Sequence, residues 1–241
     1  TFICKMEAKM IDKSRLIHKA ACLDIDITHC IDALDAYAEL LVDYNKKVNL
    51  TAITDQEGIE NKHFIDSLIF ASRKEIAGSL VDVGTGAGFP GVVTKLFRPE
   101  INLTLMEPTG KRVDFLKFLC KELGIKADIV KERAEEAARK EWREKYDIAT
   151  ARAVASLSAL SEYCLPLVKK GGMFIALKGD ASEEILNAKG AIAKLGGEFI
   201  RTESFTLPDN SQRSLVYVKK ISQTLPTYPR NGGKIAKSPL M

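Results

Sequence analysis

The feature that most constrains the fold is an alternation of short apolar runs with amphipathic stretches, which begins at Leu80. Short continuous apolar runs are typical of strands buried in a parallel sheet, and the stretches between them have helical spacing. Because this pairing recurs five times, we expect a mostly parallel sheet with helices on both faces. The expected strands are 80–83, 101–106, 127–130, 146–150 and 173–177, and the expected helices are 91–97, 111–123, 134–142, 156–168 and 183–195.

The end of this region departs from the alternation. Residues 198–207 and 214–221 look like strands, and Pro208, Asp209 and Asn210 predict a turn between them, with no helix. An antiparallel hairpin that closes a parallel sheet is typical of class I (Rossmann-like) methyltransferases, whereas nicotinamide-binding domains usually end in a parallel sixth strand. The sequence therefore predicts an α/β fold of this class with seven strands.

Two flanking regions differ from this core in texture. Residues 1–70 predict a helical N-terminal cap, in which Thr28 is expected to cap one helix and Thr54 and Glu57 stand at capping-box spacing before another. Residues 223–241 contain prolines and glycines and predict an irregular, basic C-terminal tail. The methyltransferase domain is expected over residues 71–222.

A glycine-rich motif follows the first expected strand. Asp82, Gly84, Gly86 and Gly88 stand at alternate positions, and glycine allows a tight turn that a ligand can approach closely. An acid, Glu107, ends the second expected strand and is suitably placed to accept hydrogen bonds from ribose hydroxyls. The motif therefore predicts a nucleoside-containing cofactor at the carboxyl end of the sheet.

Two cofactors compete for this motif. A dinucleotide would place its pyrophosphate against the glycine turn, where the carboxylate of Asp82 would repel it. S-adenosylmethionine has no phosphate and carries an ammonium and a sulfonium, so a neighbouring acid stabilises it. We therefore predict S-adenosylmethionine as the cofactor.

Most classes of methyl acceptor require a motif in the enzyme that this sequence lacks. Cytosine carbon-5 chemistry needs a cysteine nucleophile, often in a Pro-Cys pair, and Cys164-Leu165-Pro166 has the wrong order. Amino-group methylation usually shows an Asn/Asp-Pro-Pro-aromatic turn, where this chain has Thr150-Ala151-Arg152-Ala153. No metal-binding cluster is expected. The remaining acceptors are those with a free lone pair, such as guanine N7. Arg152 is the candidate for the cationic group at the rim of the active site. The alternative is that Arg152 only pairs with a nearby carboxylate.

The sequence resembles the RsmG (GidB) family of bacterial small-subunit rRNA guanine-N7 methyltransferases. The resemblance covers about residue 40 to the C-terminus and rests on Tyr44-Asn45-Lys46-Lys47-Val48-Asn49-Leu50-Thr51, His63-Phe64-Ile65-Asp66-Ser67, residues 82–91, Lys111-Arg112-Val113-x-Phe115-Leu116, Ala151-Arg152-Ala153 and Tyr228-Pro229-Arg230. It implies methylation of the guanine conventionally numbered 527 in 16S rRNA. Because guanine N7 attacks without first losing a proton, we expect in-line transfer without a general base. The partner is accordingly 16S rRNA or the small ribosomal subunit.

The resemblance also suggests roles for individual residues. It implies cofactor contacts from Gly84, Phe89, Ala134, Glu135 and Arg152. His63 and Asp66 stand three residues apart on an expected helix and so share a face. The family places them near RNA or cofactor, and His63 joins Arg152 as a catalytic candidate, while local hydrogen bonding explains His63 equally well. The RNA-binding candidates are Lys111, Lys178, Arg230, Lys234 and Lys237, with a solvated side chain as the alternative for Lys178.

Composition supports an RNA-binding cytoplasmic protein. No Asp or Glu occurs from Asn210 to Met241, whereas six Lys and Arg do, and the net charge of the whole chain is only +4. Five scattered cysteines without CxxC spacing argue against structural zinc and a disulfide framework. We expect a monomer that does not bind membranes. Two alternatives stay open: a methyltransferase for a small molecule or protein, and a ribosome-binding protein that keeps the fold without the activity.

Overall fold

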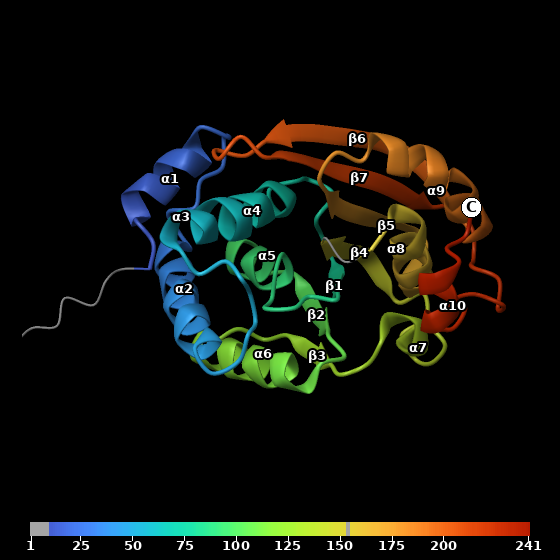
Figure 1. Cartoon of the computed structure of the whole chain (residues 1–241), viewed down its shortest axis with the longest axis horizontal. Helices are drawn as coiled ribbons and strands as arrows, with labels where there is room; N and C mark the ends of the chain where they lie inside the picture. Colours follow the sequence, from blue (N-terminus) through green and yellow to red (C-terminus); the bar gives the residue numbers. More distant parts are fainter. Residues whose placement is uncertain (1–9, 153–154) are drawn as a thin grey trace, which may run out of the picture.

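The computed structural model describes residues 10–152 and 155–241, which are built around one seven-stranded sheet (Figure 1). The strands are β1 (Ser79–Val83), β2 (Asn102–Met106), β3 (Asp128–Val130), β4 (Tyr146–Arg152), β5 (Val168–Lys178), β6 (Gly197–Thr206) and β7 (Gln212–Lys220). They lie in the order β3-β2-β1-β4-β5-β7-β6. The first five are parallel, and β7 pairs antiparallel with both β5 and β6. The predicted mostly parallel sheet with an antiparallel hairpin is confirmed.

Successive residues of each central strand enter different cores. Leu80 belongs to the hydrophobic cluster on one face of the sheet and Val81 to the cluster on the other, and Ile175 and Phe174 divide in the same way. This follows from the two-residue period of strand side chains. Because both faces are apolar, both must be covered by helices.

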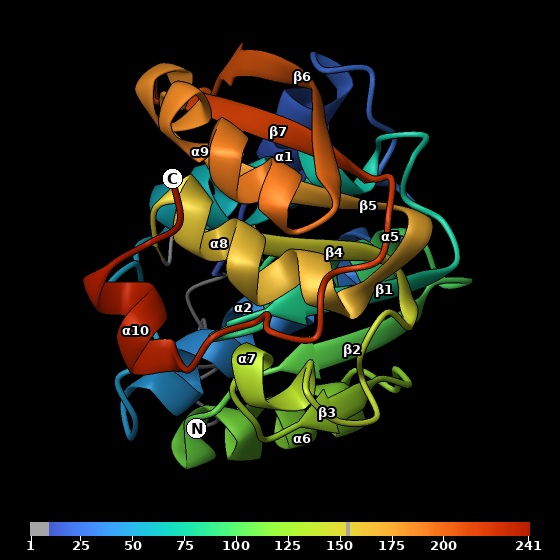
Figure 2. The ribbon, with the colours of Figure 1, turned by 90° about the vertical axis from the view of Figure 1, so that its right-hand side faces the viewer.

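Helices cover the two faces (Figures 1 and 2). On one face lie α1 (Lys13–Ala21), α2 (Ile31–Asn45), α4 (Asp66–Ala71), α5 (Gly91–Phe97) and α6 (Gly110–Glu122), with the short α3 (Gln56–Gly58) leading into a π-helix, η1 (Ile59–Ile65). On the other lie α7 (Ala134–Ala137), α8 (Leu157–Cys164), the 3-10 helix η2 (Leu165–Leu167) and α9 (Ser182–Lys194). None of the helices in the described part of the chain is long and apolar enough to cross a bilayer.

The helical N-terminal region shares its core with the sheet, but the predicted helix starts are wrong. Thr28 bonds to Asp26 through its side chain, and α2 begins after Cys30, which makes no capping hydrogen bond. Asp55, one residue after Thr54, caps α3 by accepting a hydrogen bond from Gly58 N–H. Thr and Asp compete for the same backbone donors, so neighbouring candidates are easily confused.

The C-terminal tail is more ordered than predicted. Residues 232–237 form α10 (Gly232–Lys237), whose first turn is capped by the Asn231 side chain. Ile235 is fully buried, and α10 contacts α8. One apolar contact therefore fixes a segment whose glycines and prolines suggested an irregular course.

The carboxyl ends of the parallel strands meet at one edge of the sheet. The loops after β1, β2, β4 and β5 therefore emerge side by side, and this edge is where open α/β sheets bind ligands. The candidate residues of the sequence motifs lie in or beside these loops.

Candidate functional site

The loop between β1 and α5 carries three glycines in the left-handed region, with φ of 66° at Gly84, 62° at Gly86 and 102° at Gly88. A Cβ at Gly86 would meet nothing closer than the Gly84 carbonyl oxygen, at 4.0 Å, so Gly86 borders open space. A Cβ at Gly88 would lie 2.7 Å from the Tyr37 hydroxyl. Gly86 is therefore the glycine that a ligand can approach, and Gly88 is the one that lets the cap pack against the loop.

Asp82, near the end of β1, links the two ends of this loop through hydrogen bonds. Its Oδ2 accepts hydrogen bonds from the Thr85 hydroxyl at 2.6 Å and from Gly91 N–H at 2.8 Å. Its Oδ1 is buried without a hydrogen-bond partner in the described ranges. Burial raises the pKa of Asp82 to about 6. A cationic ligand beside the loop would stabilise the carboxylate form.

Glu107 holds the same loop from the end of β2. It is almost fully buried, and its carboxylate accepts hydrogen bonds from Gly86 N–H at 3.1 Å and Thr109 N–H at 2.9 Å. The Arg112 guanidinium lies 3.7 Å from it. The acid and the glycine turn, 19 to 21 residues apart in the sequence, are thus in contact.

Ala134 and Glu135 begin α7 after β3, and both are buried. The Glu135 carboxylate stands against Gly232 of α10, where any Cβ would collide with it. The C-terminal segment therefore covers this side of the site.

Phe89 joins the loop to the helical cap. Its ring stacks with those of Tyr37, at 4.9 Å and 7°, and His63, at 4.3 Å and 10°. The Tyr37 hydroxyl donates a 2.6 Å hydrogen bond to the Ala87 carbonyl. Tyr37 is not among the residues identified from the sequence. It stands beside the apolar stripe of α2, and a tyrosine in such a position is expected to be buried with a hydrogen-bond partner for its hydroxyl.

Arg152 ends β4 and faces the cap. It donates hydrogen bonds to the Lys62 carbonyl at 2.9 Å and to Asp66 Oδ2 at 3.2 Å. Its guanidinium also lies 5.2 Å from the centre of the Phe89 ring. The expected alternative, a pair with a nearby carboxylate, is present in this geometry, and Arg152 also lines a cavity. Ala153, the next residue of the motif, lies outside the described residues.

His63 is held neutral. Burial, followed by the charge of Arg152, lowers the pKa of His63 to about 3. Because Nδ1 faces an Arg152 donor at 3.4 Å, the proton belongs on Nε2, which donates to the Thr51 hydroxyl oxygen at 3.2 Å. A ring with such a pKa is a weak base near neutrality. His63 is therefore suited to packing and positioning.

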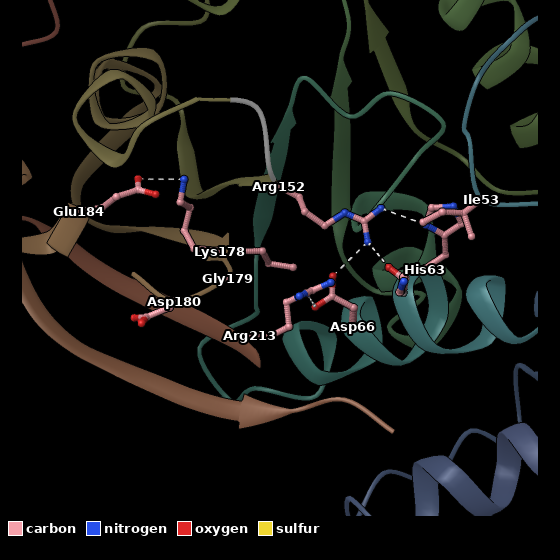
Figure 3. A pocket seen from close by; sticks show the side chains of 11 residues that line it. Ile53, His63, Asp66, Arg152, Lys178, Gly179, Asp180, Glu184 and Arg213 are labelled. Carbon is pink, nitrogen blue, oxygen red and sulfur yellow. Dashed lines mark hydrogen bonds and ion pairs between the residues drawn. The ribbon is translucent and has the colours of Figure 1, made fainter. Parts of the chain in front are cut away.

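Arg152 and His63, together with Lys62 and Asp66, line a cavity of about 540 Å³ (Figure 3). Asp66, almost fully buried, lies between Arg152 of β4 and Arg213 of β7, whose Nε is 3.7 Å from Asp66 Oδ1. Burial raises the pKa of Asp66, opposed by both arginines. The remaining wall comes from the loop after β5, including Gly179 and Asp180. Three strands and the π-helix thus share one hollow.

Lys178 also lines the cavity but is already engaged. Its ammonium donates to the Ala155 carbonyl at 2.8 Å and pairs with Glu184 at 2.9 Å. Its side chain is only 10% exposed. This geometry does not favour the predicted contact of Lys178 with phosphate.

The basic C-terminal residues divide into two groups. Arg230 donates to buried Glu162, with Nη2 at 2.7 Å from Oε2, and Lys220 is fully buried. Neither is available to a phosphate, so the expected phosphate contact of Arg230 is not supported. Lys234 and Lys237 are exposed on α10, as Lys111 is on α6. Within residues 10–152 and 155–241, no group of three or more His, Cys, Asp or Glu is suited to hold a metal ion.

Comparison with known proteins gives one family. The model of rRNA small subunit methyltransferase G (GidB) matches residues 30–225. A ribosomal RNA small subunit methyltransferase G of Alkaliphilus metalliredigens is 44% identical over 237 residues, which cover 95% of this chain and 99% of that protein. The protein of the same name from Desulforamulus reducens is 47% identical over 214 residues, covering 86% and 89%.

Solved structures share the fold at low sequence identity. A SAM-dependent O-methyltransferase from Thermotoga maritima has a TM-score of 0.52 at 14% identity, covering 77% of this chain and 72% of that one. TYW2 of M. jannaschii, solved in complex with AdoMet, also has a TM-score of 0.52, at 12% identity, covering 65% and 77%. The sheet is therefore that of the class I methyltransferases, as predicted.

Proposed function

The chain belongs to the rRNA small subunit methyltransferase G (GidB) family, and from this premise we propose that it methylates N7 of a guanine in small-subunit rRNA. The observation that carries the proposal is the meeting of two features at one sheet edge. Arg152 and His63 line the cavity of about 540 Å³, and both contact the ring of Phe89, which follows the glycine loop directly. A methyl donor on the loop and an acceptor in the cavity would thus face each other.

The cofactor is S-adenosylmethionine, which supplies a methyl group on a sulfonium when bound. The loop residues fit it: Gly86 leaves open backbone, and Asp82 has a buried oxygen without a partner in the described residues. The opening at Gly86 leaves room for the ligand, and the Asp82 carboxylate favours a cationic ligand over a pyrophosphate. We infer that Glu107 accepts hydrogen bonds from the ribose hydroxyls and that Ala134 and Glu135 border the adenine.

The acceptor chemistry fits the neutral state of His63. Guanine N7 has a free lone pair, so no residue has to remove a proton before the attack. The site then has to orient the base and hold the two reacting groups in line. Arg152, fixed by Asp66 and the Lys62 carbonyl, is the positioning cation, and neutral His63 supports Phe89. We place this rRNA modification in the cytoplasm and expect a monomer to perform it.

Methyl transfer to rRNA tests the proposal. Purified protein and labelled S-adenosylmethionine are incubated with small subunits, and separately with naked 16S rRNA, from cells that lack this protein. We expect one labelled 7-methylguanine, recognised by its alkali-labile glycosidic bond, at the guanine numbered 527. Label on an amino group or on protein would contradict the assignment. Cofactor binding without any transfer would favour a small-molecule substrate, and ribosome binding without cofactor binding a non-catalytic role.

A glycine substitution tests the cofactor site. Gly86→Val should abolish binding of S-adenosylmethionine in calorimetry, because the side chain fills the open space over the loop. Gly124→Val is the matched control, since Gly124 has φ of 64° and nothing within 4 Å. Both variants should lose roughly 1–2 kcal/mol of stability from left-handed strain. Retained binding in Gly86→Val, or binding of NAD by the wild type, would refute the assignment.

A further inference from the structure

A second hollow, of about 390 Å³, lies between the helical cap and the start of α6. Its lining residues come from two segments far apart in the sequence: Lys46, Lys47, Val48, Asn49, Thr109, Lys111 and Arg112. We call these residues the basic groove. Four of the seven carry positive charge and none carries negative charge, so the groove is suited to an anion.

The four cations are only weakly engaged within the protein. Lys46 lies 3.3 Å from Asp43, a pair in which both side chains are about two-thirds exposed. Arg112 lies 3.7 Å from Glu107. Lys47 and Lys111 are exposed and have no ion pair in the described part of the chain. The exposed Lys46–Asp43 pair contributes about 0–1 kcal/mol. The Arg112 guanidinium remains 41% exposed beside buried Glu107, so the groove keeps positive charge available to a ligand.

The sheet order places the groove relative to the acceptor cavity. Thr109, Lys111 and Arg112 follow β2, the glycine loop follows β1, and the cavity surrounds the ends of β4 and β5. The order β2-β1-β4-β5 sets the groove and the cavity on either side of the glycine loop, at the same edge. With about 4.8 Å between strands, they are on the order of 10–15 Å apart. That distance corresponds to a few nucleotides along a strand.

We propose that the basic groove binds phosphate groups of the rRNA strand a few nucleotides from the target base, which rests on the proposed function. Lysine and arginine side chains bind phosphate oxygens without regard to sequence and so fix the register of a strand. Four of the seven lining residues come from the cap, and the other three lie at the start of α6. In this proposal the cap binds the substrate directly, through its contacts with the phosphates.

Salt dependence of RNA binding tests this assignment in the full chain. The variant K47Q/K111Q should bind small-subunit rRNA roughly 25-fold more weakly at 0.1 M salt, for two lost contacts. The slope of log affinity against log salt should flatten by about 1–2. Affinity for S-adenosylmethionine should not change. The charge-preserving variant K47R/K111R should retain wild-type affinity and slope.

The matched control removes two lysines from the amino ends of the parallel strands, opposite to the ends that carry the site. Lys126 precedes β3 and Lys170 lies near the start of β5, and both are exposed. K126Q/K170Q should leave affinity and slope unchanged. A wild-type slope in K47Q/K111Q, or an equal loss in both double variants, would overturn the groove assignment alone. If the wild-type protein neither binds nor methylates rRNA, the proposed function itself fails.

Discussion

His63 is neutral because burial and Arg152 both oppose its protonation, and this makes a prediction for the reaction. Its pKa of about 3 lies far below neutrality, so single-turnover methyl transfer should be nearly flat from about pH 6 to 8. His63→Ala should weaken RNA positioning without changing the shape of the pH profile. Arg152→Ala should cost more, because Arg152 contacts both Phe89 and Asp66. A rate that rises log-linearly with pH, and loses this rise in His63→Ala, would mean that a general base operates.

Asp82 predicts a pH dependence of cofactor binding. Burial raises its pKa to about 6, so the free protein holds a proton there below that pH and a carboxylate above it. A cationic cofactor favours the carboxylate, so affinity for S-adenosylmethionine should fall as pH drops from 7 to 5. Asp82→Asn should bind more weakly at pH 7 and lose this dependence. Calorimetry from pH 5 to 7 measures the affinity of the wild type and of Asp82→Asn. If the variant keeps the pH dependence of the wild type, Asp82 is not the source of that dependence.

Residues that act through local spacing could be found from the sequence, and those that act through tertiary contacts could not. Asp82, the glycines and Glu107 follow from the strand-turn-helix pattern. The bond from Tyr37 to Ala87 joins residues 50 positions apart. Arg213, which the sequence marked only as one of the basic residues after Asn210, reaches Asp66 from β7. Nothing in the local sequence marks such partners.

At the level of elements, the alternation of strands and helices predicts type and order better than boundaries. The helix expected over 134–142 stops at Ala137, and the chain continues in turns with hydrogen bonds such as Arg139 N–H to the Glu136 carbonyl. The side chains of Arg139 and Arg143 donate to carbonyls of the C-terminal segment. Contacts with a distant segment therefore override local helical propensity.

The helix bearing His63 shows what spacing alone misses. Residues 59–65 form a π-helix, although the spacing of His63 and Asp66 predicted only a shared helical face. Within it, buried Glu60 pairs with Arg15 and Lys19 of α1. Since π-helical turns often occur at functional sites, η1 and its anchor on α1 belong to the positioning of the site.

The contact between α2 and the glycine loop gives an element-scale prediction. Tyr37→Phe removes the hydrogen bond to Ala87 and leaves that carbonyl unsatisfied. The free energy of unfolding should fall by about 1–3 kcal/mol, and affinity for S-adenosylmethionine should fall several-fold as the loop loosens. Tyr163→Phe is the control, because that hydroxyl makes no hydrogen bond within the described ranges. Denaturant unfolding and calorimetry measure the two effects, and cofactor affinity equal to that of the control would mean that Tyr37 serves stability alone.

At the scale of the whole molecule, the flanking regions 10–70 and 223–241 both pack onto the methyltransferase domain. The N-terminal helices share a core with α5 and α6, and the segment after β7 returns to α7 and α8. The composition of the C-terminal segment is enough to predict that this segment is positively charged. It does not show which charges are used internally, because Arg230 and Lys234 look alike in sequence and only one of them faces a buried carboxylate.

This division of the basic residues can be measured. Arg230→Ala leaves Glu162, which is 0% exposed, without its partner, and such a loss costs about 3–5 kcal/mol of stability. Lys234 and Lys237 are exposed, so K234Q/K237Q should change stability by less than about 0.5 kcal/mol.

The double variant E162M/R230M should recover part of the loss, because an apolar pair often replaces a buried ion pair at little cost. Recovery should be incomplete, since the backbone N–H of Arg230 also donates to Glu162, at 2.7 Å. Denaturant unfolding and the salt dependence of rRNA binding, measured on all three variants, separate the two roles. If Arg230→Ala keeps wild-type stability and flattens the salt slope, Arg230 faces phosphate after all, and the internal role assigned to it is wrong.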